Sequence, residues 1–137
     1  MSSREERLTE EFPRHSFFQL FLWFWLPVAI YVAVIFGLSA QPNLHAPFGF
    51  AKADKLMHML EYGGLGFLLS RALRATGRVR LAIRVALSVL VIGAAVGACD
   101  EVFQSFIPGR ESSVADWVAD VTGLLFAQLI YLLFTHD

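Results

Sequence analysis

The chain has 137 residues, of which 56% are hydrophobic and 17% are charged, and its mean hydropathy is +0.57. Such a composition is too apolar for a soluble domain of this size, so we expect a protein that uses lipid as its solvent. The net charge of −1 gives no basic excess, and we expect no nucleic-acid partner. A lone cysteine, Cys99, excludes an internal disulfide and a metal site built on a cysteine pair, which leaves pairing with another chain or, as we expect, a buried small side chain.

An uncharged run from Phe17 to Ser39 follows a polar segment at residues 1–16. The run is longer than the apolar part of a signal peptide and long enough to cross about 30 Å of hydrocarbon. We therefore predict a first membrane-spanning helix and not a cleaved signal, preceded by a cytoplasmic N-terminal segment.

Three further helices are predicted along the rest of the chain. Proline and glycine residues separate the apolar stretches, because their backbones break helices. We place these helices at about 54–73, 81–106 and 113–134. Ser113 and Asp116 have the spacing of a capping box at the start of the last helix. The prediction is an all-α protein in which residues 17–137 form one bundle of four transmembrane helices.

Basic residues are distributed unevenly around the predicted helices. Arginines flank the first helix on its N-terminal side and surround the connection between the second and third helices, namely Arg4, Arg7, Arg14, Arg71, Arg74, Arg78, Arg80 and Arg84. The other two connections carry only Lys52, Lys55 and Arg110. Because lysine and arginine are retained on the cytoplasmic side, we expect both termini in the cytoplasm. The connections after the first and third helices then face outward.

Polar residues interrupt the second predicted helix, and their spacing places them on one face: Asp54, His58, Glu61 and Tyr62. We expect that face to point into the bundle. Ionisable groups at membrane depth are energetically expensive and usually functional, which singles out His58 and Glu61. Asp54 fits a helix N-cap equally well, and Tyr62 fits a packing residue that donates a hydrogen bond.

The third predicted helix ends with Asp100, Glu101 and Gln104. A helix dipole presents its negative pole at this end, so acidic groups there need cationic compensation. We expect Lys55 and Arg110 to provide it. We also expect the three side chains to hydrogen-bond with the second helix or with the turn that ends at Arg110. Such a network fits a purely structural role as well as a functional one.

The start of the fourth predicted helix carries two acids, Asp116 and Asp120, which lie one turn apart on the same face. The capping box explains Asp116 in part, whereas Asp120 needs a partner or a proton in an apolar environment. Ser112 and Ser113 add hydroxyl donors beside the N–H groups of the helix start, a combination suited to an anion.

Two separated motifs resemble those of the VanZ-like family of membrane proteins. They read Asp54-Lys55-x-x-His58-x-x-x-Tyr62 and Asp100-Glu101-x-x-Gln104-x-x-x-Pro108-Gly109-Arg110, and Asp116 follows them. Asp120 stands where the family usually has asparagine, three residues before Gly123. The resemblance implies a multi-pass protein of the bacterial cytoplasmic (inner) membrane, within the cell envelope. It also implies a link to antibiotic resistance, since the founding member is associated with resistance to the glycopeptide teicoplanin.

Three functions fit these residues. The first is binding of an anionic membrane lipid, a lipid-linked cell-wall intermediate or a lipoglycopeptide at the outer leaflet. The binding residues would be Asp54, Lys55, Tyr62, Gln104, Arg110, Ser112, Ser113, Asp116 and Asp120. The second is an enzyme in which His58 acts as general acid or base with Asp100 or Glu101 as its partner. The third is a structural subunit whose polar cluster only locks the bundle.

A metal site would need more ligands than one helix offers. His58 and Glu61 amount to half of such a site, and the remaining ligands would have to come from other helices. We therefore expect no metal and no other cofactor.

Overall fold

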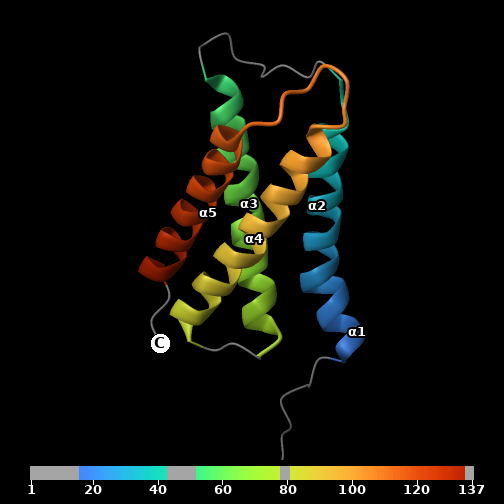
Figure 1. The fold of residues 1–137 in the computed structure, drawn as a ribbon. Coiled ribbons are helices and arrows are strands. Elements are labelled where there is room, and N and C mark those ends of the chain that lie inside the picture. The colour runs from blue at the N-terminus through green and yellow to red at the C-terminus, as the bar shows by residue number, and fades with distance from the viewer. Residues whose placement is uncertain (1–15, 43–51, 78–80, 135–137) are drawn as a thin grey trace, which may run out of the picture.

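The computed structural model describes residues 16–42, 52–77 and 81–134. All of the regular structure in these ranges is helical, which confirms the predicted all-α class (Figure 1). The elements are α1 (Phe17–Leu20), η2 (Phe21–Trp25), α2 (Leu26–Ser39), α3 (Ala53–Ala75), α4 (Ala82–Gln104) and α5 (Val114–Phe134). Because α1, η2 and α2 continue directly into one another, the described residues form four helical rods. The predicted N-terminal segment, apart from Ser16, lies outside the described residues.

Ser16 begins the first rod with a capping box. Its hydroxyl accepts a hydrogen bond from the Gln19 amide (3.4 Å), and the Gln19 side chain accepts one from the Ser16 amide (3.0 Å). The rod changes to π-helical hydrogen bonding over η2, just before Pro27. Proline has no N–H and its ring clashes with the preceding turn, so a wider turn at this point keeps the rod continuous.

Three of the rods are long and apolar enough to cross a membrane, namely Phe17–Ser39, Ala82–Gln104 and Val114–Phe134. Their outer faces expose large apolar side chains such as Ile30, Val91 and Leu133. A surface of this kind suits lipid and not water, so the protein is a membrane protein. The remaining rod, α3, has 23 residues, as many as α4, but it is too polar to meet the same criterion. A fourth span there stays a prediction.

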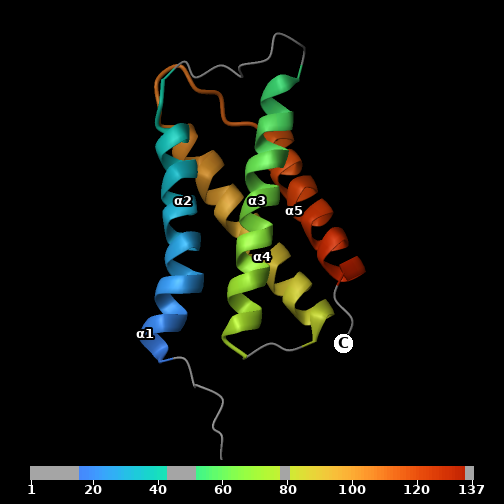
Figure 2. The same ribbon diagram turned by 180° about the vertical axis from the view of Figure 1, so that it is seen from behind.

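α3 occupies the middle of the bundle. Figure 2 shows it between α2 and α5, with α4 crossing behind, and α3 packs against each of these helices. The core consists of buried apolar side chains from all four rods: Val28, Ile35, Tyr62, Leu65, Leu69, Val85, Val89 and Leu124. The polar residues at the end of the bundle are therefore held on a packed scaffold.

α3 and α5 make backbone-to-backbone contact at Gly123. A Cβ added to Gly123 would overlap the backbone carbonyl of Met59, so only glycine permits this approach. Small residues allow helices to come this close in membrane bundles. His58 directly precedes Met59, and Asp120 lies three residues before Gly123. The close approach therefore brings the His58 and Asp120 side chains to the same level.

Cys99 is exposed on the outer surface of α4, so the expectation that it is buried is wrong. Gly97 and Asp100 are both buried and define the inward face at this level of the helix. A residue one position before Asp100 is rotated by about 100° from it, which carries Cys99 out of the bundle. Apolar surroundings are still available to the thiol there, because this face of α4 is the lipid-facing one.

Candidate functional site

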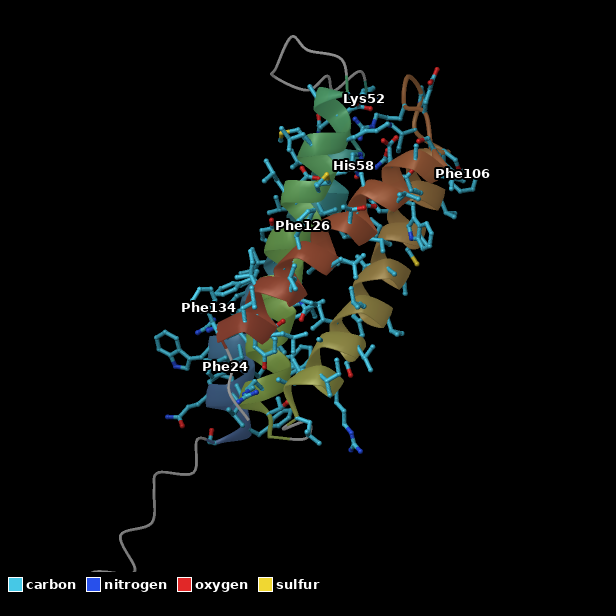
Figure 3. The ribbon with its side chains drawn as sticks, turned by 90° about the vertical axis from the view of Figure 1, so that its left-hand side faces the viewer. Phe24, Lys52, His58, Phe106, Phe126 and Phe134 are labelled. Carbon is cyan, nitrogen blue, oxygen red and sulfur yellow. The ribbon has the colours of Figure 1, made fainter. Side chains whose placement is uncertain are left out.

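Most of the polar side chains singled out from the sequence gather at one end of the bundle. This end is formed by the last turn of α2, the first turns of α3 and α5 and the last turns of α4, and it lies at the top of Figure 1. Figure 3 shows Lys52 and His58 toward this end, whereas Phe24 lies near the opposite one. The convergence of three helix ends that the sequence predicts is therefore present.

His58 and Asp120 form a buried pair between α3 and α5. The Nδ1 atom of His58 lies 2.8 Å from Oδ1 of Asp120, whose side chain is 0% exposed. Gly97 of α4 provides the space for this carboxylate, because a Cβ at Gly97 would lie 3.0 Å from Oδ2 of Asp120. The partner that a buried Asp120 carboxylate requires is therefore His58.

Glu101 fixes the start of α5 from the neighbouring helix. Its Oε2 accepts a hydrogen bond from the Ser113 backbone N–H at 2.8 Å. Ser113 Oγ in turn accepts one from the Asp116 N–H at 3.1 Å, as expected for an N-cap. In the predicted capping box, Asp116 would have received the N–H of Ser113. That half of the prediction is wrong, because Glu101 occupies the position.

Asp116 instead forms an ion pair with Lys55. The Nζ atom of Lys55 lies 2.6 Å from Oδ1 of Asp116 and 3.3 Å from Oδ2 of Asp54. The second oxygen of Asp116 accepts a hydrogen bond from the Ser113 hydroxyl at 2.9 Å. The Lys55 ammonium group therefore holds α3 to the first turn of α5. We expected Lys55 to compensate the acids at the end of α4, but its ion-pair partners here are Asp54 and Asp116.

Asp100 and Gln104 bind the end of α2. Asp100 Oδ2 accepts hydrogen bonds from Ser39 Oγ at 2.9 Å and from Gln104 Nε2 at 3.1 Å, and Gln104 Nε2 also lies 3.1 Å from Ser39 Oγ. We expected partners on the second helix or on the turn at Arg110, but the hydrogen-bond partner is Ser39 of the first rod. Arg110 acts on Asp100 electrostatically.

Ser39 was missed at the sequence level. It is the last residue of a long apolar run and is 4% exposed, and its hydroxyl links α2 to α4. A signal was available, because a polar residue that ends an apolar span often faces the bundle interior.

The α3 residues that we expected on one inward face differ in how deeply the structure buries them. His58 is mostly buried and Tyr62 is fully buried, but the Asp54 side chain is 57% exposed beside Lys55. Glu61 is partly buried, and its backbone carbonyl accepts a hydrogen bond from the Tyr31 hydroxyl at 3.0 Å. Asp54 lies in the first turn of α3 and is rotated by about 100° from the buried Ala53, which places its side chain on an open side of the helix. Ser112 is exposed as well.

Polar atoms without a hydrogen-bond partner converge inside this end of the bundle. Among the described residues they are the Tyr62 hydroxyl, Oδ1 of Asp100, Oε1 of Glu101 and Oδ2 of Asp120. Buried oxygen atoms normally have a partner, and leaving one without a partner costs about 1–3 kcal/mol. The arrangement therefore has capacity for a bound group that interacts with several carboxylates at once.

An apolar groove of about 500 Å³ runs along the seam between α3 and α5. Its α3 side begins at Leu56 and continues past Met59 and Gly63, and its α5 side includes Gly123 and Phe126. Leu56 and Met59 directly follow Lys55 and His58 in sequence, so the groove reaches the level of the polar cluster along the axis of α3. Figure 3 shows Phe126 on the other side of His58 from Lys52.

Comparison with known proteins supports the resemblance noted in the sequence. The family described as VanZ/LLP1 matches residues 2–135. No curated protein and no solved structure matches the chain. The family match includes the apolar rods and the residues of the polar end, from Ser39 to Asp120. Since it covers essentially the whole sequence, the chain belongs to the VanZ/LLP1 family.

Proposed function

We propose that this protein is a multi-pass protein of the bacterial cytoplasmic membrane that binds an anionic, lipid-linked envelope compound at the outer leaflet. The observation that carries the proposal is the apolar groove between α3 and α5, which reaches the level of the polar cluster along the bundle. A lipid could place its acyl chain in this apolar groove and its polar head near the polar cluster. The ligand class includes lipid-bearing glycopeptides, which the resistance associated with the founding member implies.

The head of such a lipid would meet the cations and donors at the polar end. Lys55 is part-exposed near the end of the groove, and Arg110 follows the turn at Gly109, whose φ of 79° favours glycine. Arginine presents a planar fork of N–H donors to phosphate or carboxylate. The N–H and hydroxyl of Ser113 are donated to Glu101 and Asp116, but Ser112 is exposed and lies two residues after Arg110, just before α5. These groups support recognition of an anionic head.

The proposal requires the polar end to face outward, with α3 as the fourth span and both termini in the cytoplasm. In a Cys99→Ser background, Glu111→Cys is expected to react with a membrane-impermeant thiol reagent in intact cells. Leu81→Cys, at the opposite end of the bundle, is expected to react only after the membrane is opened. Both original side chains are exposed. The expectation follows from the retention of arginines on the cytoplasmic side. The reverse labelling would place the polar end in the cytoplasm and contradict the proposal.

Filling the groove tests the proposal directly. Gly63 lines the groove, and a Cβ there would make only an ordinary contact, 3.6 Å from the Gly123 carbonyl oxygen. Gly63→Leu is therefore expected to fold and to project its side chain into the groove. A steric conflict between this side chain and an acyl chain, of about 1–3 kcal/mol, lowers the affinity for the lipid about 5- to 150-fold. Native mass spectrometry of delipidated protein titrated with phosphatidylglycerol measures this occupancy.

Gly37→Leu is the matched control, because a Cβ at Gly37 meets nothing within 4 Å and Gly37 lies on α2, away from the groove. This variant is expected to bind phosphatidylglycerol as the unaltered protein does. Phosphatidylcholine, which has the same chains and no net charge, is expected to bind less tightly than phosphatidylglycerol. Equal occupancy in the Gly63→Leu and Gly37→Leu variants would exclude the groove, and equal binding of the two lipids would exclude anion recognition.

The hydrogen bond between His58 and Asp120 favours a second candidate function, an enzyme that acts on the same lipid. A carboxylate on Nδ1 orients an imidazole and leaves Nε2 for proton transfer. The partner is Asp120, whereas Asp100 or Glu101 was expected. Release of a cleaved head group from phosphatidylglycerol by the unaltered protein, and not by the His58→Gln variant, would establish this function.

A further inference from the structure

We infer that His58, Glu101 and Asp120 form a binding site for one divalent transition-metal ion. The three residues come from α3, α4 and α5, and one ligand atom of each lies within 4.8 Å of the other two. Imidazole nitrogen and carboxylate oxygen bind zinc at about 2.0–2.2 Å. A small closure of three side chains around a central point therefore brings them to coordination distance. The expectation from the sequence that no metal binds rested on His58 and Glu61, which is a different set.

Two of these side chains carry buried oxygen atoms that lack partners. Glu101 is 6% exposed and Asp120 is 0% exposed, and Oε1 of the first and Oδ2 of the second have no hydrogen-bond partner in the part of the chain that the structure describes. The other oxygen of Glu101 accepts the Ser113 N–H, and Oδ1 of Asp120 lies 2.8 Å from Nδ1 of His58, a contact between two of the proposed ligands. Glu101 is thus held in place by one oxygen and keeps the other available, as in a preformed metal site, and a bound ion would take the place of the direct contact between His58 and Asp120.

The balance of charge at this end also favours a bound cation. Lys55 is engaged by Asp54 and Asp116, and Arg110 interacts electrostatically with Glu61 and Asp100. The ion-pair partners of Lys55 are therefore acids other than Glu101 and Asp120. A divalent ion bound by two carboxylates and a neutral imidazole gives a site with no net charge, which reduces the penalty for burying ionised groups.

The ligand set indicates the class of ion. One imidazole and two carboxylates suit zinc, manganese or iron(II) better than the harder magnesium and calcium ions, which prefer oxygen ligands alone. Three protein ligands leave a coordination position open, as in catalytic zinc sites. If the proposed lipid binding also holds, this position would accept a phosphate or carboxylate oxygen of the lipid head. The metal site itself does not depend on that step.

The test uses the full chain in detergent, washed with EDTA and free of added lipid, so that its outcome is separate from lipid binding. After incubation with Mn²⁺ and removal of excess, elemental analysis is expected to find about one ion per chain. Pulsed electron paramagnetic resonance of the bound Mn²⁺ is expected to show coupling to an imidazole nitrogen. This spectrum reports on the unaltered protein, so it decides the question even where a variant fails to fold.

Substitutions then identify the ligands. Glu101→Gln and Asp120→Asn keep the shape of each side chain but remove its charge, and each is expected to lower Mn²⁺ affinity at least tenfold. Glu111→Gln removes a charge from an exposed acid near the same end and is expected to leave the affinity unchanged. Absence of a stoichiometric ion, absence of the nitrogen coupling, or equal affinity in the Asp120→Asn and Glu111→Gln variants would each overturn the inference.

Discussion

The Gly123→Ala variant is expected to lose about 3 kcal/mol or more of its free energy of unfolding. The added methyl group would overlap the backbone carbonyl of Met59, and a backbone cannot rotate away as a flexible side chain can. Overpacking of a core commonly destabilises by about 1–3 kcal/mol, and a backbone clash belongs at the upper end of that range. The two helices must therefore separate. Unfolding by sodium dodecyl sulfate in mixed micelles, followed by circular dichroism, measures the change.

Gly37→Ala is the control for this variant. Both glycines lie inside helices, but a Cβ at Gly37 meets nothing within 4 Å. Alanine exceeds glycine in helix propensity by up to about 1 kcal/mol, so this variant is expected to be unchanged or slightly stabilised. Equal stability of the Gly123→Ala and Gly37→Ala variants would show that α3 and α5 do not depend on this contact.

His58→Ala is expected to destabilise the protein by about 3–5 kcal/mol in the presence of EDTA, which keeps metal ions out of the comparison. Removing one partner of a buried pair leaves the other without compensation, and Asp120 is fully buried. Adding Asp120→Asn to the His58→Ala variant is expected to restore part of the loss, because an amide is less costly to bury than a carboxylate. The same unfolding measurement applies.

Lys55→Ala provides the comparison for that result. Lys55 also forms an ion pair with an aspartate across α3 and α5, but its side chain is 32% exposed. A pair open to water is expected to contribute only about 0–1 kcal/mol. If the His58→Ala variant lost no more stability than the Lys55→Ala variant, the buried pair would not support the bundle. If the double variant with His58→Ala and Asp120→Asn were less stable than the His58→Ala variant alone, the uncompensated charge of Asp120 would not be the cause of the lost stability.

The helices could be predicted from sequence because apolar runs and helix-breaking residues are local signals. The run from Phe17 to Ser39 corresponds to one continuous rod, although its π-helical turn has no signal beyond the nearby Pro27. Inward and outward faces were harder to assign. In lipid both faces of a helix are apolar, so the periodicity that reveals a buried face in a soluble protein is weak. The exposure of Cys99 could not be predicted for this reason.

The sequence predicted which residues form the candidate site better than it predicted which of them contact one another. Polar residues at membrane depth stand out in an apolar sequence, and spacing alone placed His58 and Tyr62 on one face. The pairing of His58 with Asp120 depends on where α3 and α5 cross, and a glycine contact determines that point. Such a contact joins residues more than 60 positions apart, so no local pattern contains it. Ser39 was missed because the sequence does not show which helix faces the acids of α4.

The contact between Met59 and Gly123 also determines how the two helices can move. On the side away from the polar end, α3 and α5 are joined through side chains, as in the hydrogen bond of 3.0 Å from Ser70 to Gln128. Side chains adjust to a change in crossing angle more readily than touching backbones do. The backbone contact is therefore the point about which a swing of α5 against α3 would displace the two helices least. Such a swing changes the width of the groove along its length, while the neighbouring His58 and Asp120, close to the axis, keep their separation.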